Sequence, residues 1–150
     1  MSRRAYSEIN LHITWHVKDD EPILRDAIED HLHRHFRERV DAEPGVFWRG
    51  SGGTGDHVHV VVSISPEVPI SEWVGRLKGE SSHYINHVIV NRKLLHWQGG
   101  YGVVSFGTKD LPWVLGYVCD QRRLHAERRT HERLERTEPV QDDKPAEAGS

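Results

Sequence analysis

The sequence predicts an α+β fold: a four-stranded antiparallel sheet with two helices on one face, the split βαβ or ferredoxin-like arrangement, followed by a C-terminal helix. One observation behind this prediction is the order of the periodic segments, which follow one another as β-α-β-β-α-β-α. Another is the length of 150 residues, which corresponds to a single domain. We expect the domain to cover residues 1–136, and residues 137–150 to form a disordered acidic tail.

The first half of the chain is expected to hold a strand, a helix and a hairpin. Apolar residues stand at every second position of residues 9–17, which is typical of a strand with one buried face. Residues 23–40 carry apolar residues at helical spacing after an acidic segment. Residues 46–49 and 57–65 indicate the two strands of a hairpin, joined by a flexible glycine-rich turn at residues 50–55.

The second half is expected to hold a helix, a strand and a final helix. Ser71 is a suitable N-cap for a helix that the apolar pattern extends to about Val90. Residues 102–106 indicate the fourth strand. Asp110 stands where it can cap a last helix that runs to about Leu134.

Charge is unevenly distributed along the chain. The formal net charge is −3, yet residues 45–136 hold twelve Lys and Arg against nine Asp and Glu. The arginines are densest near the end of this stretch, at Arg122, Arg123, Arg128, Arg129, Arg133 and Arg136. Such residues either form a solvated helix face or contact phosphates, and the pattern leaves both interpretations open.

Several classes of protein are excluded by composition. Cys119 is the only cysteine, which rules out an internal disulfide and a cysteine-based zinc cluster. No apolar run approaches the ~20 residues that a membrane span requires, and the N-terminal residues lack the apolar core of a signal peptide. We therefore expect a soluble cytoplasmic protein with no membrane partner.

Two histidines on the third predicted strand form a candidate metal site. His57 and His59 are two residues apart, so on a strand they project from the same face as Val61. Two imidazoles make half of a metal site, although surface histidines on a half-exposed strand need no metal. His31/His35 and His83/His87, at helical spacing of four residues, are rival ligand pairs.

The last predicted helix offers the groups that would complete such a site. Tyr117 and Gln121 are four residues apart, which places a hydroxyl and a carboxamide oxygen on one helix face. If that face packed against the histidine strand, Gln121 would be a third ligand and Tyr117 a nucleophile beside it. A tyrosine on an amphipathic helix is also commonly part of a core, and this alternative stays open.

Four segments together resemble a known family. They are Gly55-Asp56-His57-Val58-His59, Arg76-Leu77-Lys78-Gly79-Glu80-Ser81-Ser82, His96-Trp97-Gln98-Gly99-Gly100-Tyr101 and Tyr117-Val118-Cys119-Asp120-Gln121. In this order and spacing they resemble the single-tyrosine HUH transposases, which include small insertion-sequence transposases and REP-associated tyrosine transposases. The resemblance implies that residues 1–136 form a catalytic domain, with Tyr117 as nucleophile and His57, His59 and Gln121 as ligands of Mg²⁺ or Mn²⁺.

The resemblance also implies a reaction and partners. The reaction is cleavage and rejoining of single-stranded DNA through a covalent 5′-phosphotyrosine, with no nucleotide cofactor, on DNA with hairpin ends and by a homodimer. The segment containing Lys78, Ser81 and Ser82 resembles one that lies near the DNA path in the family. Arg122 and Arg123 from the basic stretch, and Tyr101 by stacking on bases, are further candidate DNA contacts.

Two other function classes remain open from the residues alone. One is a ferredoxin-like nucleic-acid-binding protein without catalysis. The other is a histidine-rich metal-binding protein, for which twelve histidines in the chain would supply several sites.

Overall fold

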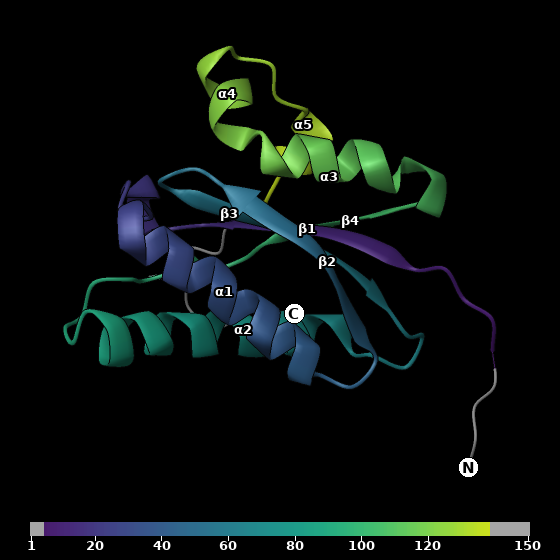
Figure 1. The fold of residues 1–150 in the computed structure, drawn as a ribbon, viewed down its shortest axis with the longest axis horizontal. Helices are drawn as coiled ribbons and strands as arrows, with labels where there is room; N and C mark the ends of the chain where they lie inside the picture. The colour runs from purple at the N-terminus through teal and green to yellow at the C-terminus, as the bar shows by residue number, and fades with distance from the viewer. Residues whose placement is uncertain (1–4, 139–150) are drawn as a thin grey trace, which may run out of the picture.

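The computed structural model describes residues 5–138, and its four-stranded antiparallel sheet confirms the predicted fold class. The strands are β1 (Asn10–His16), β2 (Val46–Gly53), β3 (His57–Ile64) and β4 (Gly102–Phe106), in the spatial order β2-β3-β1-β4 (Figure 1). Each neighbouring pair is antiparallel, which is the split βαβ arrangement. The predicted tail at 137–150 lies outside the described residues from position 139 onward.

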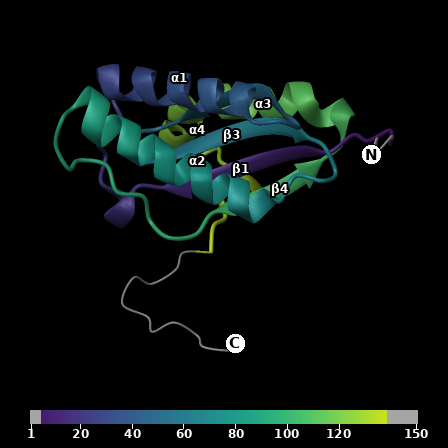
Figure 2. The same cartoon turned by 90° about the horizontal axis from the view of Figure 1, so that it is seen from below.

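Helices cover both faces of the sheet. α1 (Asp26–Ala42) and α2 (Ile70–Tyr84) pack on one face, and α3 (Leu111–Cys119) and α4 (Gln121–Ala126) lie on the other (Figures 1 and 2). The short α5 (Glu132–Glu135) contacts β4 and β1. Within the part of the chain that the structure describes, no helix has the length and hydropathy needed to cross a bilayer.

Strand alternation separates an apolar core from a polar face. Val58, Val60 and Val62 of β3 point into the main core, where the Trp15 ring makes edge contacts with Phe36. The intervening residues of β3 face α3, α4 and α5. Because the side-chain period of a strand is two, the same strand supplies core contacts on one face and histidines on the other.

The first two helices start at other residues than the pattern predicts. α1 begins at Asp26 and not at residue 23, because Arg25 has an extended backbone. Leu24, just before it, is fully buried, and its N–H donates a hydrogen bond to the Gly55 carbonyl oxygen. α2 begins at Ile70 after Pro69, so Ser71 is not its N-cap. After Tyr84 the chain continues as a π-helical segment at Ile85–Ile89.

The glycine-rich segment at residues 50–55 is not the flexible turn that the sequence suggests. β2 continues through it to Gly53, with a bulge between Trp48 and Gly50. A Cβ on Gly52 would lie 2.0 Å from the Val118 carbonyl oxygen. Glycine therefore allows α3 to pack directly on the backbone of β2, which fixes the distance between α3 and the sheet.

The single final helix predicted from Asp110 to about Leu134 is wrong, since this region forms three short helices. The chain leaves helical geometry at Asp120 (φ −110°, ψ 25°), and it turns again at Arg128, whose φ is +56°. The Tyr117 carbonyl accepts a hydrogen bond of 3.1 Å from the Gln121 side-chain amide at this break. The second turn brings α5 back over the sheet, so the C-terminal segment reaches the histidine face of β3.

A half-buried histidine of α1 predicts how stability depends on pH. His33 Nδ1 lies 2.7 Å from Ser51 Oγ, and burial lowers the pKa of His33 to about 4 from its usual 6.5. The unfolded chain therefore takes up a proton that the folded chain does not, and this contribution to stability falls as the pH drops from about 6.5 toward 4. In urea unfolding at pH 7 and pH 5, His33→Gln should reduce the loss of stability on acidification. His83→Gln, at an exposed position of α2, should leave the loss as in the wild type.

Candidate active site

His57 is held by groups at the start of β3. Its Nδ1 lies 2.7 Å from Asp56 Oδ1 and 2.8 Å from Thr54 Oγ1. Burial acts to lower the pKa of His57, but the hydrogen bonds and charges of Asp56 and Glu135 outweigh it and raise the pKa to about 9. With Nδ1–H donating to Asp56, Nε2 is directed into the site, which is the carboxylate–histidine arrangement found behind many metal ligands.

His59 is fully buried and pairs with a third histidine. Its Nδ1 lies 2.7 Å from Nε2 of His12, a β1 residue on the same face of the sheet. Burial lowers the pKa of His12 to about 3, so this partner is neutral. If His59 donates from Nδ1, its Nε2 retains a lone pair, and that Nε2 makes no hydrogen bond among the described residues.

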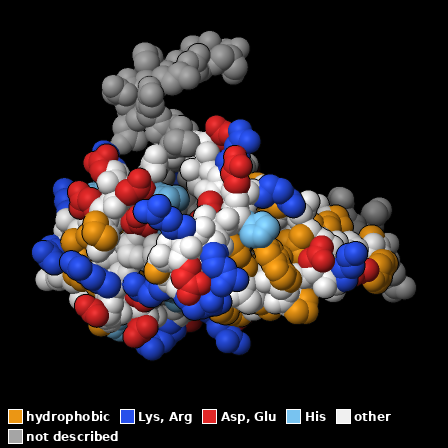
Figure 3. Space-filling view, turned by 90° about the horizontal axis from the view of Figure 1, so that it is seen from above, with side chains coloured by type: hydrophobic (Ala, Val, Ile, Leu, Met, Phe, Trp, Pro, Cys, Tyr) orange, Lys and Arg blue, Asp and Glu red, His pale blue; other side chains and the backbone are white. Residues whose placement is uncertain are grey.

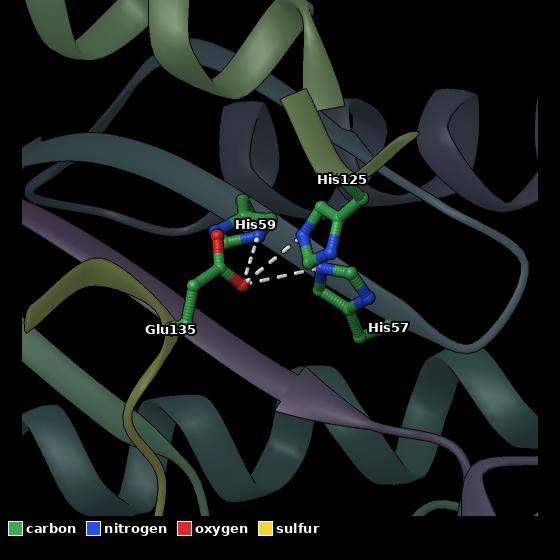
Figure 4. A group of neighbouring side chains, drawn as sticks. All are labelled: His57, His59, His125 and Glu135. Carbon is green, nitrogen blue, oxygen red and sulfur yellow. Dashed lines mark ion pairs between the residues drawn. The ribbon is translucent and has the colours of Figure 1, made fainter. Parts of the chain in front are cut away.

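The broken C-terminal region brings oxygen and nitrogen donors to the two histidines. Gln121 Oε1 lies 3.2 Å from His57 Nε2 and 2.9 Å from Nε2 of His125. Glu135 Oε1 lies 3.4 Å from His57 Nε2 and 3.3 Å from His59 Nε2 (Figure 4). Since His59 Nε2 is without a hydrogen bond and the converging donors are imidazole nitrogens and oxygens, these residues fit a divalent cation.

Tyr117 lies beside these ligands with its hydroxyl fully engaged. Its Oη donates a short hydrogen bond to Glu135 Oε2 and accepts one of 2.8 Å from the His131 N–H. Its ring stacks on Trp113 and makes an edge contact with the His59 ring. Burial and the hydrogen bond to Glu135 raise the pKa of Tyr117 to about 12, so the phenol is protonated in this arrangement.

The rival histidine pairs do not gather further ligands. The rings of His83 and His87 lie 4.2 Å apart, and the His35 ring stacks on Tyr84. Within residues 5–138, groups of three or more His, Cys, Asp and Glu donors occur only around His57. The pairs His31/His35 and His83/His87 are therefore not part of a multi-ligand site in the part of the chain described.

The residues predicted near DNA from α2 and the following loop hold the fold together. Lys78 Nζ donates to the carbonyls of Gln98 and Gly100 at 2.9 and 2.8 Å. Ser81 is buried, and the hydroxyls of Ser81 and Ser82 both donate to the Lys78 carbonyl. Tyr101 is half-buried and packs against the main core. DNA contact by Lys78, Ser81, Ser82 and Tyr101 stays a prediction.

The arginine stretch lies on an exposed surface of mixed charge. Arg122 makes a two-point contact with Glu29 of α1, and Arg123 pairs with Asp120 and Glu127. Seen from the side of α3 and α4, basic and acidic side chains are interspersed (Figure 3). Phosphate contact by Arg122 and Arg123 therefore stays a prediction. To make it, each arginine would have to leave its carboxylate partners in the protein and pair with DNA phosphates.

Sequence reasoning missed four residues of the site, namely His12, Asp56, His125 and Glu135. His12 has the strand alternation that puts it on the histidine face, Asp56 directly precedes His57, and His125 follows Gln121 by four residues. Those signals were available. Glu135 had none, because its approach depends on the turn between α4 and α5.

Asp56→Asn is expected to weaken metal binding without removing a ligand. The amide keeps a similar shape but loses the charge that orients His57, and changes to such supporting residues cost roughly 10–100-fold in metal affinity. Titration with Mn²⁺ measures the effect. Asp110→Asn is the matched control, since Asp110 is exposed and its side chain makes no capping hydrogen bond. Equal Mn²⁺ affinity of Asp56→Asn and wild type would contradict the supporting role of Asp56.

Solved structures that share this fold include those of two proteins described as transposases. One is a Deinococcus radiodurans protein assigned as a transposase, with a TM-score of 0.65 and 19% identity over 86% of this chain and 96% of that chain. The other is a REP-associated tyrosine transposase bound to a REP hairpin, with a TM-score of 0.60 and 14% identity over 87% of this chain and 75% of that chain. No curated protein sequence matches the chain.

A family model described as "Transposase IS200 like" matches residues 5–121. The match runs from before β1 to Gln121, so it includes the histidine strand, the Tyr117 helix and the glutamine beside them. It covers well over half of the sequence. The chain therefore belongs to the family of IS200-like transposases.

Proposed function

We propose that this transposase cleaves and rejoins single-stranded DNA through a covalent 5′-phosphotyrosine on Tyr117. The observation that carries the proposal is the convergence of Tyr117 and Gln121 with His57 and His59 on one face of the sheet. A nucleophilic hydroxyl next to a cluster of metal ligands is what phosphodiester exchange requires.

In the proposed reaction, Tyr117 supplies the attacking atom. Tyr117 Oη attacks the scissile phosphorus, a bond forms between Oη and phosphorus, and the bond from phosphorus to the 3′ oxygen breaks. Glu135 Oε2 accepts the hydrogen bond from Oη, so this carboxylate orients the attacking oxygen as its proton departs. The proton that Tyr117 gives up is balanced by the proton that the 3′ oxygen gains as it leaves as a 3′-OH. Attack by a second 3′-OH on the phosphotyrosine reverses these steps and completes strand transfer.

His57, His59 and Gln121 are the residues proposed to hold Mg²⁺ or Mn²⁺. When bound there, the ion polarises a non-bridging oxygen of the phosphate and stabilises the charge of the transition state. One phosphodiester is exchanged for another, so the bond energy is retained and no nucleotide cofactor is needed.

The partners are proposed on the same basis. One structural neighbour is a transposase bound to a REP hairpin, which supports hairpin-ended DNA as the substrate here. Lys78, Ser81, Ser82, Tyr101, Arg122 and Arg123 are the proposed DNA contacts. We further propose a cytoplasmic homodimer in which the tyrosine helix serves the histidines of either its own or the other subunit.

The direct test is a search for the covalent intermediate. Labelled single-stranded oligonucleotides from the flanks of the gene are incubated with the protein and Mn²⁺, and the products are separated under denaturing conditions. A labelled protein–DNA adduct that needs the metal is the expected result, and peptide mapping should place the label on Tyr117. Cleaved DNA without an adduct would overturn the proposal, as would an adduct mapped to another residue.

A further inference from the structure

We propose that Glu135 is a ligand of the metal site, a carboxylate that the C-terminal segment adds to His57, His59 and Gln121 in the DNA-free protein. The inference rests on the proposed function, since it concerns the same metal site. It adds a negatively charged oxygen ligand from a part of the chain beyond the residues that match the family model.

The distances around Glu135 Oε1 are those of neighbouring metal ligands. This oxygen lies 3.4, 3.3 and 3.5 Å from Nε2 of His57, His59 and His125. Ligands at about 2.1 Å from a shared ion are separated by roughly 3.0 Å at octahedral angles and 3.4 Å at tetrahedral angles. These four donor atoms all lie within 4.8 Å of one another, so a single ion can be reached by Glu135 together with His57 and His59, while His125 borders the same site.

A simple ion pair explains the geometry less well. An ion pair with one imidazole would bring Glu135 Oε1 closer to that nitrogen than to the others. Instead Oε1 is nearly equidistant from three nitrogens, and the Nε2 of His59 makes no hydrogen bond among the described residues. Nearly equal distances from one ligand atom to several other donor atoms are expected when all of them surround one cation.

The backbone of the C-terminal segment is fitted to the sheet so that Glu135 faces the site. Leu134 is buried against a cluster that includes Val61 and Val118. A Cβ on Gly102 of β4 would lie 1.9 Å from the Arg136 carbonyl oxygen, so only glycine lets the segment pass this close. Residues on both sides of Glu135 are thus anchored, and its side chain is only 17% exposed.

The two carboxylate oxygens connect the ligand cluster with the nucleophile. Oε1 faces the imidazoles while Oε2 accepts the hydrogen bond from Tyr117 Oη. Binding of the ion by Oε1 would therefore also fix the position of Oε2, the oxygen that accepts the hydrogen bond from the Tyr117 hydroxyl. Since Mn²⁺ commonly accepts six ligands, positions for phosphate oxygens remain beside four protein ligands.

The test is Mn²⁺ affinity, measured by calorimetry on the full-length protein without DNA. Glu135→Gln is expected to weaken Mn²⁺ binding by about tenfold or more, because an amide replaces a charged ligand. Glu132→Gln is the matched control, with the same charge change on an exposed residue of the same short helix, and should bind Mn²⁺ like the wild type.

A second variant tests the same claim without altering any ligand. Gly102→Ala should push the Arg136 backbone away from β4, displace Glu135 and weaken Mn²⁺ binding in the same direction. Thermal unfolding checks that each variant is folded. If Glu135→Gln does not fold, the Mn²⁺ affinity of Gly102→Ala decides the test. Wild-type Mn²⁺ affinity in folded variants at both positions overturns the inference. His57→Ala in the same assay separates the two claims. If it abolishes Mn²⁺ binding while the Glu135 and Gly102 variants bind normally, the proposed metal site stands and only the role of Glu135 is wrong. If it also binds Mn²⁺ normally, the proposed metal site itself is wrong.

Discussion

Tyr117→Phe is expected to abolish formation of the covalent adduct and to reduce cleavage of hairpin-bearing single-stranded DNA by about 10⁴-fold or more, since the variant lacks the attacking oxygen. DNA binding should persist. The ring remains stacked on Trp113, and only the hydrogen bonds to Glu135 and to the His131 N–H are lost. The measurements are cleavage of a labelled oligonucleotide with Mn²⁺ and a binding isotherm for the same oligonucleotide without the metal.

Tyr84→Phe is the control for this experiment. Tyr84 belongs to α2 on the opposite face of the sheet and stacks on His35, so its hydroxyl has no part in the site. Cleavage by Tyr84→Phe should match the wild type. Undiminished cleavage by Tyr117→Phe would show that another group is the nucleophile. A wild-type protein that binds the DNA but never cleaves it would favour the non-catalytic nucleic-acid-binding alternative.

The strands β1, β3 and β4 and the histidine pair were predictable because their signals are local. Alternation along β1 and β3 fixes which side chains share a face, whatever the rest of the chain does. His57 and His59 therefore lie on the face opposite Val58 and Val60, as predicted, and both are buried there. The site also required the Tyr117 helix to pack on this face of the sheet. In the structure Tyr117 and Gln121 do lie beside the two histidines.

The approach of Glu135 to the site was not predictable, because it depends on long-range contacts. No proline or glycine stands between Tyr117 and Leu134, so local signals suggested one unbroken helix. The breaks are accompanied by contacts with other elements, including the close approach of Val118 to Gly52 and of Arg136 to Gly102. A single continuous helix would carry Glu135 past the sheet, whereas the turns return it to Tyr117 and the histidines.

His57→Ala is expected to remove the strong metal site, weakening Mn²⁺ binding by on the order of 100-fold or more and abolishing metal-dependent cleavage. His57 is a better choice than His59, because we expect its loss to disturb the fold less. The Asp56 carboxylate that supports it is 38% exposed and can be solvated by water, whereas removing His59 would leave His12 buried without its partner. Calorimetry gives both the affinity and the number of ions bound per chain.

The stoichiometry separates the proposed enzyme from a histidine-rich metal-binding protein. A single catalytic site predicts one strongly bound ion per chain, lost in His57→Ala and retained in a His31→Ala/His35→Ala double variant. Metal storage predicts several ions, with that double variant losing some of them and His57→Ala losing only part of the total. The described structure favours the first outcome, because donors gather in groups of three or more only around His57, while His35 is occupied in stacking on Tyr84. Several ions of similar affinity, still bound after His57→Ala, would contradict the assignment of His57 to the catalytic metal site.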